Sequence, residues 1–354
     1  MVFFRKSLIK KYFVLIIPRS RVNFSLKENF LMTKIDLVYL WCDSTDEEWS
    51  AKRKRFQQYD CIEKTAAADC RFINNNELLF SMRSVAKFVP WVNHIYLITD
   101  HQIPSWLNVE HPKITLINHE DILPREVLPT FNSTAIETGI HNIRGLSEHF
   151  LLANDDTFFG RKVDPDFFFS KNFPISRMSV PFVNQGDRYG LLIQKCFELV
   201  GQKCRIGFEA KPYHNIDAYR KSVYREVYDI FSQETTRTRR NRFRCSDDIM
   251  RWCVSLYEVW HNKAPFIVID NRELSGSVCF SGVKKWLNRI RYRFFPRQAA
   301  YYSCLRKIDV DRFFKNPKPC VFCINDDMMT TDEHRERAYE LLSRMFPDKC
   351  EFEK

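Results

Sequence analysis

The sequence predicts an α/β fold: a Rossmann-like, mostly parallel sheet with flanking helices and a helical section from about residue 215 to 262. Short continuous apolar runs recur along the chain, which is typical of parallel strands that are buried on both faces. Segments with apolar residues at helical spacing separate these runs, as in right-handed βαβ units. Most runs end in acidic or amide side chains, and open α/β sheets bind their ligands at the carboxyl ends of strands.

The elements are expected in the following order. Strands are predicted at residues 35–41, 95–100, 114–117, 150–153 and 321–324, and helices at residues 47–59, 75–88 and 134–143. The helix over 75–88 has one apolar face, formed by Leu78, Leu79, Met82, Val85 and Ala86. Isoleucines at helical spacing predict the helix over 134–143, which Asn132 and Ser133 can cap and Gly145 ends.

The loop after the first strand, Cys42 to Asp46, has two interpretations. An acidic loop after a first strand is typical of a nucleotide-binding edge. The same residues also suit a capped helix start, with Ser44 or Thr45 as the N-cap and Glu47 in the first turn.

Asn154, Asp155 and Asp156 follow the apolar strand over 150–153. Two adjacent carboxylates repel each other unless a cation or a proton lies between them, which favours a divalent-metal and nucleotide-diphosphate site. The alternative is a strand that ends in an Asx turn, which Asn and Asp often form.

Composition places the chain among ordinary globular proteins. Hydrophobic residues make up 45% of its 354 residues and charged residues 28%. With only 9 glycines it contains neither a GxGxxG nor a GxxxxGK motif, so a bound nucleotide would need something other than a glycine cradle.

The positive charge is uneven: the net charge is +11, and residues 1–27 and 274–308 contain basic residues and no acid. We therefore expect a basic N-terminal extension over residues 1–30 and a single catalytic domain over residues 31–354. Such charge suits a polyanion, an anionic membrane face or a phosphorylated substrate. No nucleic-acid-binding motif accompanies it, so nucleic acid is not an expected partner. Residues 283–294 form a basic amphipathic pattern that suits either a membrane-surface helix or a helix docked on the sheet.

The twelve cysteines predict reduced, buried thiols of a cytoplasmic protein, since many lie in apolar runs. Cys320 and Cys323 have CxxC spacing but lack a second ligand pair, so they do not predict structural zinc. The longest apolar stretch near the N-terminus, Tyr12 to Pro18, is too short to span a bilayer.

Several longer blocks are specific enough to indicate a family. They are IDLVYLWCDSTDEEW, NNELLFSMRSVAKFVPWVNHIYLITDHQIPSWL, LPTFNSTAIETGIHNIRGLSEHFLLANDDTFFG, KPYHNIDAYRKSVYREVYDIF with NRFRCSDDI, and KPCVFCINDDM. Over residues 34–330 the chain resembles the Stealth family of hexose-1-phosphate transferases, related to the animal GlcNAc-1-phosphotransferase. One position departs: the family's third block reads His-x-Pro, and this chain has His214, Asn215 and Ile216.

The resemblance implies transfer of hexose-1-phosphate from a UDP-sugar to a saccharide hydroxyl in capsule or exopolysaccharide synthesis, with release of UMP. Oxygen ligands from Asp155 and Asp156 suit Mg²⁺ or Mn²⁺, and Asp326 can complete the site. A turn after the strand over 321–324 is the alternative role for Asp326. Asn154 is expected to hold the substrate.

His214 is the expected general base, because histidine titrates near working pH, although a lone histidine is more often structural. Arg244 is the expected phosphate ligand, since its planar fork suits a phosphate. The other arginines of the 236–244 run suit a solvated or acceptor-binding surface. Further substrate-binding candidates are Asp43, Arg83, Asn132, Ser133 and Asp247; for Arg83 the alternative is a salt bridge on the helix surface.

Two other functions remain open on the sequence. A metal-dependent glycosyltransferase would use the same strand-end acids and a nucleotide-sugar, and a basic scaffold would bind polyanionic polysaccharide or membrane. For the transferase we expect a cytoplasmic protein, in contact with the inner face of the bacterial membrane through its basic segments.

Overall fold

The computed structural model describes residues 34–58, 68–180, 188–207, 210–270, 298–303, 309–326 and 328–354. The chain divides into Met1–Thr33, which lies outside the described residues, and Lys34–Lys354. The predicted helix over 283–294 and Asp327 also lie outside them.

The central sheet has five strands in the order β10-β4-β1-β2-β3. β1 (Ile35–Leu40), β2 (Ile95–Thr99), β3 (Ile114–Asn118) and β4 (His149–Asn154) are parallel, and β10 (Asp217–Arg220) runs antiparallel to β4. The chain builds β1, β2 and β3 in one direction and then returns to place β4 on the other side of β1. This reversal creates a switch point between β1 and β4, where sheets of this kind bind ligands. The predicted Rossmann-like α/β fold is therefore confirmed.

Three smaller sheets surround the central one. β12 (Ala299–Ser303) is parallel to β13 (Val321–Asn325), which is antiparallel to β5 (Thr157–Phe159). β11 (Phe266–Asp270), β8 (Ser176–Val180) and β9 (Lys211–Pro212) form the second, and β6 (Phe169–Ser170) with β7 (Phe173–Pro174) the third. Because β5 follows β4 after a two-residue turn, β13 is brought to the end of β4.

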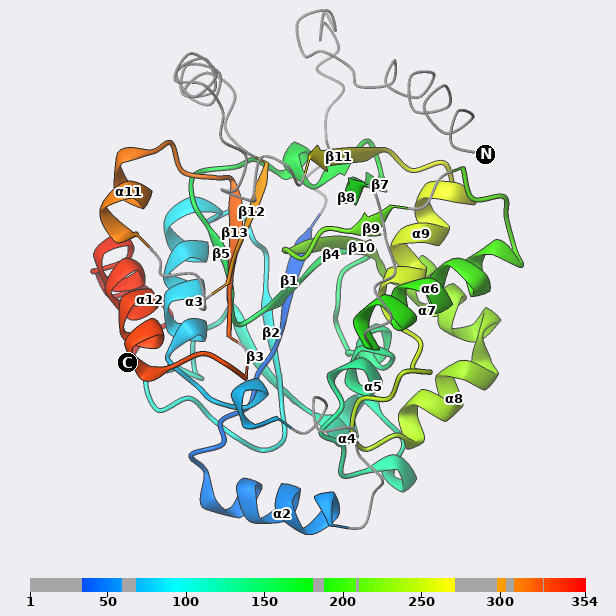
Figure 1. The fold of residues 1–354 in the computed structure, drawn as a ribbon, viewed down its shortest axis with the longest axis horizontal. Helices are drawn as coiled ribbons and strands as arrows, with labels where there is room; N and C mark the ends of the chain where they lie inside the picture. The colour runs from blue at the N-terminus through cyan, green and yellow to red at the C-terminus, as the bar shows by residue number, and fades with distance from the viewer. Residues whose placement is uncertain are drawn as a thin grey trace, which may run out of the picture. The chain divides into compact units, whose positions relative to one another are not determined.

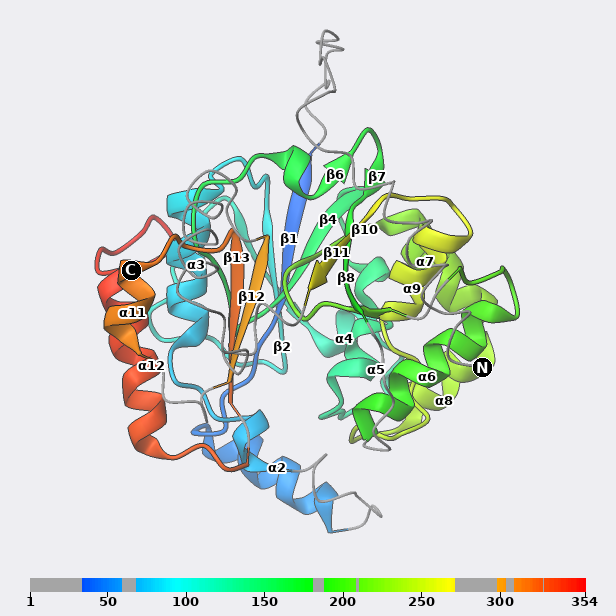
Figure 2. The ribbon, with the colours of Figure 1, turned by 45° about the horizontal axis from the view of Figure 1, so that its top comes forward.

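Helices cover both faces of the central sheet. On one side of β1 lie α3 (Glu77–Phe88), α11 (Val310–Lys315) and α12 (Asp332–Met345), together with β12 and β13 (Figures 1 and 2). On the other side lie α6 (Arg188–Gly201), α7 (Lys221–Ile230), α8 (Ser232–Arg240) and α9 (Trp252–Trp260). The predicted helical section thus begins with the edge strand β10 and becomes helical at Lys221.

The strands are buried because their successive side chains enter two different cores. Leu37, Tyr39 and Leu151 pack on the α3 side, whereas Val38 and Leu152 pack on the other side, against helices α6, α7 and α9. All five are fully buried. Continuous apolar runs are therefore required here, as expected for strands with both faces covered.

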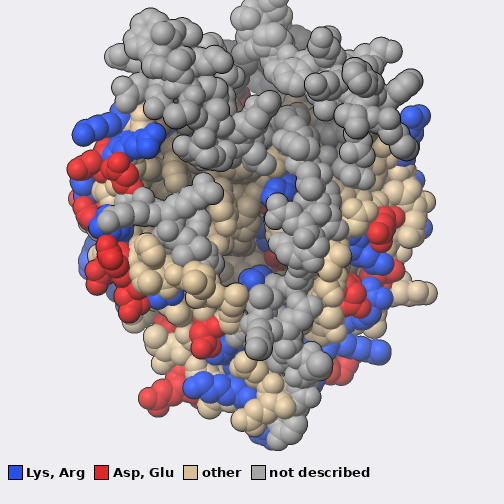
Figure 3. All heavy atoms as spheres, viewed as in Figure 1, with Lys and Arg blue, Asp and Glu red and all other residues tan. Residues whose placement is uncertain are grey.

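Charged side chains on the described part of one face are mixed in sign. Lys, Arg, Asp and Glu are interspersed along the rim formed by α11 and α12, and the centre of that face carries few of them (Figure 3). None of the helices in the described part of the chain combines the length and apolar character needed to cross a bilayer.

The loop after β1 is a capped helix start. Asp46, and not Ser44 or Thr45, is the N-cap of α2 (Glu47–Gln57), and its side chain accepts a hydrogen bond from the Trp49 amide. Ser44 and Thr45 instead form the turn before it. Thr45 is held there by the Asp43 carboxylate, 2.9 Å from its amide nitrogen, so it is not placed to cap the helix.

The predicted helix over 134–143 is wrong in its length. The structure has α5 (Ser133–Glu137), followed by a separate 3₁₀ turn, Ile140–Asn142. Gly139 lies between them and approaches the carbonyl of Ile122 so closely that a Cβ atom would be 2.7 Å from it. The two segments are separated at Thr138 and Gly139, although the isoleucines that predicted one continuous helix are all buried in the core.

Gly160 sets the distance between β5 and β13. Its amide donates to the Cys320 carbonyl at 2.9 Å, and a Cβ atom would lie 2.2 Å from the Pro319 carbonyl oxygen. Any side chain here must push β13 away from β5.

We expect Gly160→Ala to lower the free energy of unfolding by about 1–3 kcal/mol, the usual cost of overpacking. Urea denaturation measures it. Gly201→Ala is the matched control, because its Cβ atom would meet nothing nearer than Ile206 at 3.9 Å. A loss no larger than that of the control would contradict the proposed close contact.

Candidate active site

The acidic turn between β4 and β5 is both a turn and a carboxylate pair. The Asp155 carboxylate accepts the Asp156 amide at 3.1 Å, and the Thr157 hydroxyl donates to the Asn154 carbonyl. The carboxylates nevertheless face a charged neighbourhood. Burial raises the pKa of Asp155 well above its usual range, and the neighbouring charges of Asp156 and Glu77 raise it further. Burial also raises the pKa of Asp156.

Two more carboxylates reach this turn from other elements. Glu77 begins α3 and accepts two hydrogen bonds from Asn75, while its charge acts on Asp155, Asp156 and Asp326. Asp326 follows β13 and is ion-paired with Arg335 at 2.8 Å. These four carboxylates come from three elements that lie apart in the sequence.

The carboxylates suit a hard divalent cation. One oxygen of Asp156 and one of Asp326 are buried and have no hydrogen-bond partner. Buried oxygens of this kind cost free energy unless something binds them, and carboxylate oxygens are the ligands that Mg²⁺ and Mn²⁺ prefer. Among the described residues, however, the group whose ligand atoms all lie within 4.8 Å of one another is Asp156, His214 and Cys323. The predicted ligand set Asp155, Asp156 and Asp326 therefore stays a prediction.

His214 lies at the same turn. It occupies the loop between β9 and β10, and one of its ring nitrogens, an Asp156 oxygen and the Cys323 sulfur lie within 4.8 Å of one another. In the His-Asn-Ile departure from the family pattern, the Asn215 side chain donates to the Tyr213 carbonyl and Ile216 is fully buried. Those contacts hold the loop in place without the proline.

The His214 ring is neutral over the working pH range. Burial, followed by the charges of Arg251, Arg244 and Lys211, lowers its pKa to about 3. Its ring nitrogen is therefore unprotonated at working pH, but a pKa this low makes it a weak proton acceptor in the free protein. In the free protein no activity change between pH 5 and 8 should come from its titration, unlike the expectation from an ordinary histidine.

Arg244 and the loop that carries it are held by Ser133 and Asn132, two residues that had been expected to bind substrate. Its guanidinium donates to the Ser133 hydroxyl, with Nε 3.0 Å away. Asn132 is fully buried and caps α5, and its amide donates to the Asn241 and Phe243 carbonyls. Asn132 and Ser133 thus tie the start of α5 to the loop that carries Arg244.

Asp247 and Asp248 differ in burial and in the contacts that they make. Asp247, a predicted substrate ligand, forms an ion pair with Arg237 in which both side chains are more than 40% exposed. Asp248 is fully buried and accepts from Asn132 and from the Cys245 amide. The residue that shapes the site is therefore Asp248, which the sequence did not single out.

Arg251 is the main residue that sequence reasoning missed. It is buried, is ion-paired with Glu137, lies 3.5 Å from Asp217, and donates to the Asn154 side chain at 3.5 Å. Its charge lowers the pKa of Asp156. These partners lie 34 to 114 residues away in the sequence, and no local pattern links them.

Asp43 and Arg83 are held by structural contacts. The Asp43 carboxylate accepts from Thr45 and from the Asn74 amide at 2.8 Å. Arg83 forms a bidentate pair with Glu353, each contact 2.8 Å, and donates to the Phe346 carbonyl. For Arg83 this is the salt bridge that had been the alternative role, made to the C-terminal segment.

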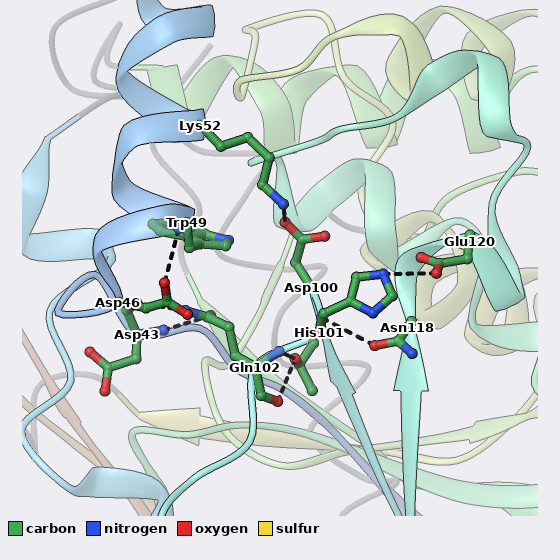
Figure 4. Close-up of polar contacts among 10 residues, drawn as sticks. Asp43, Asp46, Trp49, Lys52, Asp100, His101, Gln102, Asn118 and Glu120 are labelled. Atoms are coloured by element: carbon green, nitrogen blue, oxygen red, sulfur yellow. Dashed lines mark hydrogen bonds and ion pairs between the residues drawn. The ribbon is translucent and has the colours of Figure 1, made fainter.

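The loops after β1, β2 and β3 are tied together beside this edge of the sheet (Figure 4). The Gln102 amide accepts from the Asp43 amide and donates to the Asp43 carbonyl, so it acts as a two-point clamp. Lys52 pairs with Asp100 at 2.5 Å, and further along His101 pairs with Glu120. The clamp fixes the end of β1 next to the switch point.

Comparison with known proteins agrees with the motifs. Residues 71–176 match Stealth protein CR2, conserved region 2, and residues 213–252 match Stealth protein CR3, conserved region 3. The chain is 32% identical over 308 residues to the capsular polysaccharide phosphotransferase LcbA of Neisseria meningitidis, an alignment that covers 83% of this chain and 77% of that protein. The chain belongs to the Stealth family, as its motifs predicted.

Two other relatives, both also named as phosphotransferases, align with most of this chain. The exopolysaccharide phosphotransferase cps2G of Lactiplantibacillus plantarum is 33% identical over 66% of this chain and 79% of its own length. The capsular polysaccharide phosphotransferase fcs1 of Haemophilus influenzae is 28% identical over 98% of this chain and 96% of its own. A solved galactosyltransferase, LgtC, covers 88% of this chain and 96% of its own at 11% identity and a TM-score of 0.42, too weak a likeness to bear on the chemistry.

We expect Arg251→Met to destabilise the protein by about 3–5 kcal/mol, because Glu137 and Asp217 would be left buried without a cation. Urea denaturation measures it. Arg237→Met removes an exposed ion pair and should cost at most about 1 kcal/mol. Equal losses for both variants would show that the buried network contributes no more than the surface pair.

Proposed function

We propose that this protein transfers a sugar-1-phosphate from a UDP-sugar to a hydroxyl group of a saccharide, as a phosphotransferase of capsular or surface polysaccharide synthesis. The observation that carries the proposal is the convergence of a carboxylate cluster, His214 and Arg244 at the switch point of the sheet. The names of the aligned relatives, all phosphotransferases, favour phosphoryl transfer over the alternative, glycosyl transfer.

The residues divide the reaction between them. The acceptor oxygen attacks the β-phosphorus, the bond between that phosphorus and the bridging oxygen breaks, and UMP leaves with the bond's electron pair. The proton of the acceptor hydroxyl passes to His214. Arg244 donates to the phosphoryl oxygens, on which negative charge accumulates in the transition state.

Asp155, Asp156 and Asp326 would hold the divalent cation, and Glu77 adds to their negative field. When bound, Mg²⁺ or Mn²⁺ neutralises the charge of the diphosphate. Arg251 keeps Asn154 and Asp217 in place beneath these acids. Asn154 is then positioned to contact the donor.

Donor binding should also change the pKa of His214. Burial, and after it the positive charges of neighbours that include Arg244, hold the pKa of His214 low in the free protein. A diphosphate at Arg244 would add negative charge there and raise the pKa of His214 toward the working range, where a general base is most effective. The base would thus strengthen when the donor is present.

Contact with an anionic membrane through residues 1–30 stays a prediction, as do the cytoplasmic location and the division of the chain at residue 30.

The product distinguishes the two enzyme classes. We expect the full chain, incubated with a panel of UDP-sugars, Mg²⁺ and saccharide acceptors, to release UMP, and chelation by EDTA to abolish the release. Chromatography of the nucleotide products measures it. Release of UDP would mean glycosyl transfer, and turnover that persists in EDTA and in Asp155→Asn would remove the metal from the mechanism.

The base and the phosphate ligand should respond differently to substitution. His214→Ala should lower turnover by about 10²–10⁴-fold with little change in donor affinity, because the base contacts the acceptor. Arg244→Lys should slow turnover even with the donor saturating, because lysine keeps the charge but loses the planar fork. Steady-state kinetics and donor titrations measure both.

Arg237→Lys is the matched control for Arg244→Lys, since it alters an exposed arginine nearby on α8. If His214→Ala retained near-normal turnover, another group would have to accept the proton.

A further inference from the structure

Cys323 is the group at this site to which the proposed reaction gives no role. It is fully buried on β13, and its thiol donates to an Asp156 oxygen at 3.2 Å. Backbone pairing fixes this arrangement: Cys323 is paired with Thr157, and the Ile324 amide donates to the Asp156 carbonyl at 3.0 Å. The sulfur is therefore held at the acidic turn by the sheet itself.

His214 completes a cluster of three different donor atoms. A carboxylate oxygen of Asp156, a ring nitrogen of His214 and the sulfur of Cys323 lie within 4.8 Å of one another. In a tetrahedral zinc site with bonds of about 2.0–2.3 Å, neighbouring ligand atoms lie about 3.5 Å apart. The three atoms need to move by only about 1 Å to reach that geometry.

The donor types select the kind of metal. Mg²⁺ prefers oxygen ligands, whereas an oxygen, an imidazole nitrogen and a thiolate together suit Zn²⁺ or Co²⁺. Three protein ligands with a fourth position open are typical of zinc sites that bind an additional ligand. The other oxygen of Asp156 is buried without a hydrogen-bond partner, so the carboxylate is not already committed to the protein on that side.

We propose that Asp156, His214 and Cys323 form a second metal site, selective for a soft divalent cation such as Zn²⁺, whose occupation inhibits transfer. On binding, the thiol proton is released to solvent and a metal–sulfur bond takes its place. The inhibition rests on the proposed function: the metal takes the His214 lone pair that would accept the acceptor's proton, and it competes for Asp156 with the cation held by the carboxylates.

Co²⁺ binding tests the site without any turnover. The full chain, without substrate, is titrated with Co²⁺, and we expect a thiolate-to-cobalt charge-transfer band that Zn²⁺ abolishes by displacement. Cys323→Ser should lose the band and bind Co²⁺ about tenfold more weakly or worse. Cys320→Ser is the matched control, since Cys320 is buried nearby but lies outside the cluster.

Absence of the band in the wild-type protein, or its persistence in Cys323→Ser, would overturn the site. If Cys323→Ser does not fold, alkylation of the wild-type protein replaces it. Because Cys323 is fully buried, the labelling is done with iodoacetamide in urea just below the unfolding midpoint, where transient opening exposes the thiol. Zn²⁺ should slow the labelling of Cys323, as read by peptide mass spectrometry, and equal labelling rates with and without Zn²⁺ would overturn the proposal.

Inhibition is measured separately with Mg²⁺ present. Zn²⁺ should lower wild-type turnover, and the inhibiting concentration should rise about tenfold or more in Cys323→Ser, with each protein compared to its own uninhibited rate. A cobalt band without inhibition would support the metal site but overturn its inhibitory effect. A cobalt band in a protein that transfers no sugar-1-phosphate would support the metal site but overturn the proposed function.

Discussion

Buried negative charge at the ends of β4 and β13 is the constraint on which the rest of the site depends. Four carboxylates meet there, and burial together with mutual repulsion raises the pKa of Asp155 and Asp156. Such a cluster persists in a folded protein where positive charge compensates it or a carboxyl group is protonated. Arg251 and Arg335 supply part of that charge from within the protein, and a bound cation would supply the remainder.

Arg251 connects this constraint to the scaffold. It reaches α5 through Glu137, β10 through Asp217 and the end of β4 through Asn154. One buried guanidinium therefore aligns the helical side of the site with the central sheet. Burial is the main cause of the low pKa of His214, and the positive charge of Arg251 lowers that pKa further.

The second half of the site is arranged by hydrogen bonds to α5. Asn132 and Ser133 were expected to touch substrate, which stays a prediction, and the structure shows them holding the 241–248 loop and the Arg244 guanidinium. Residues that hold a substrate-binding side chain in place are of the same polar types as the residues that bind the substrate. Their roles therefore cannot be separated by residue type, only by which atoms already have partners.

The four parallel strands of the central sheet, β13, the helices α2 and α3 and the Stealth family could be predicted from the sequence, because apolar periodicity and motif spacing are local properties. The two 14-residue helices, α6 and α12, were not predicted. Asp155, Asp156, His214 and Arg244 were predicted as site residues in the same way, since each lies in a recognisable block, and their roles stay predictions. The prediction of one continuous helix over 134–143 was wrong, because the structure separates two segments at Thr138 and Gly139, where Gly139 also packs against the Ile122 carbonyl of a distant segment. The prediction of Ser44 or Thr45 as the N-cap was wrong because Asp43, outside the capping pattern, holds Thr45 in the preceding turn.

The sequence by itself determined the main parallel strands, their burial and the chemical types available at their ends. Only the tertiary structure decided which of these groups meet: the return of β13 beside β5 brings Cys323 to Asp156, and the β9–β10 loop brings His214 to both. The physical reason is that contact between distant segments depends on strand pairing and side-chain packing across the whole domain. A local pattern specifies a strand, but the energy of many non-local contacts selects its neighbour.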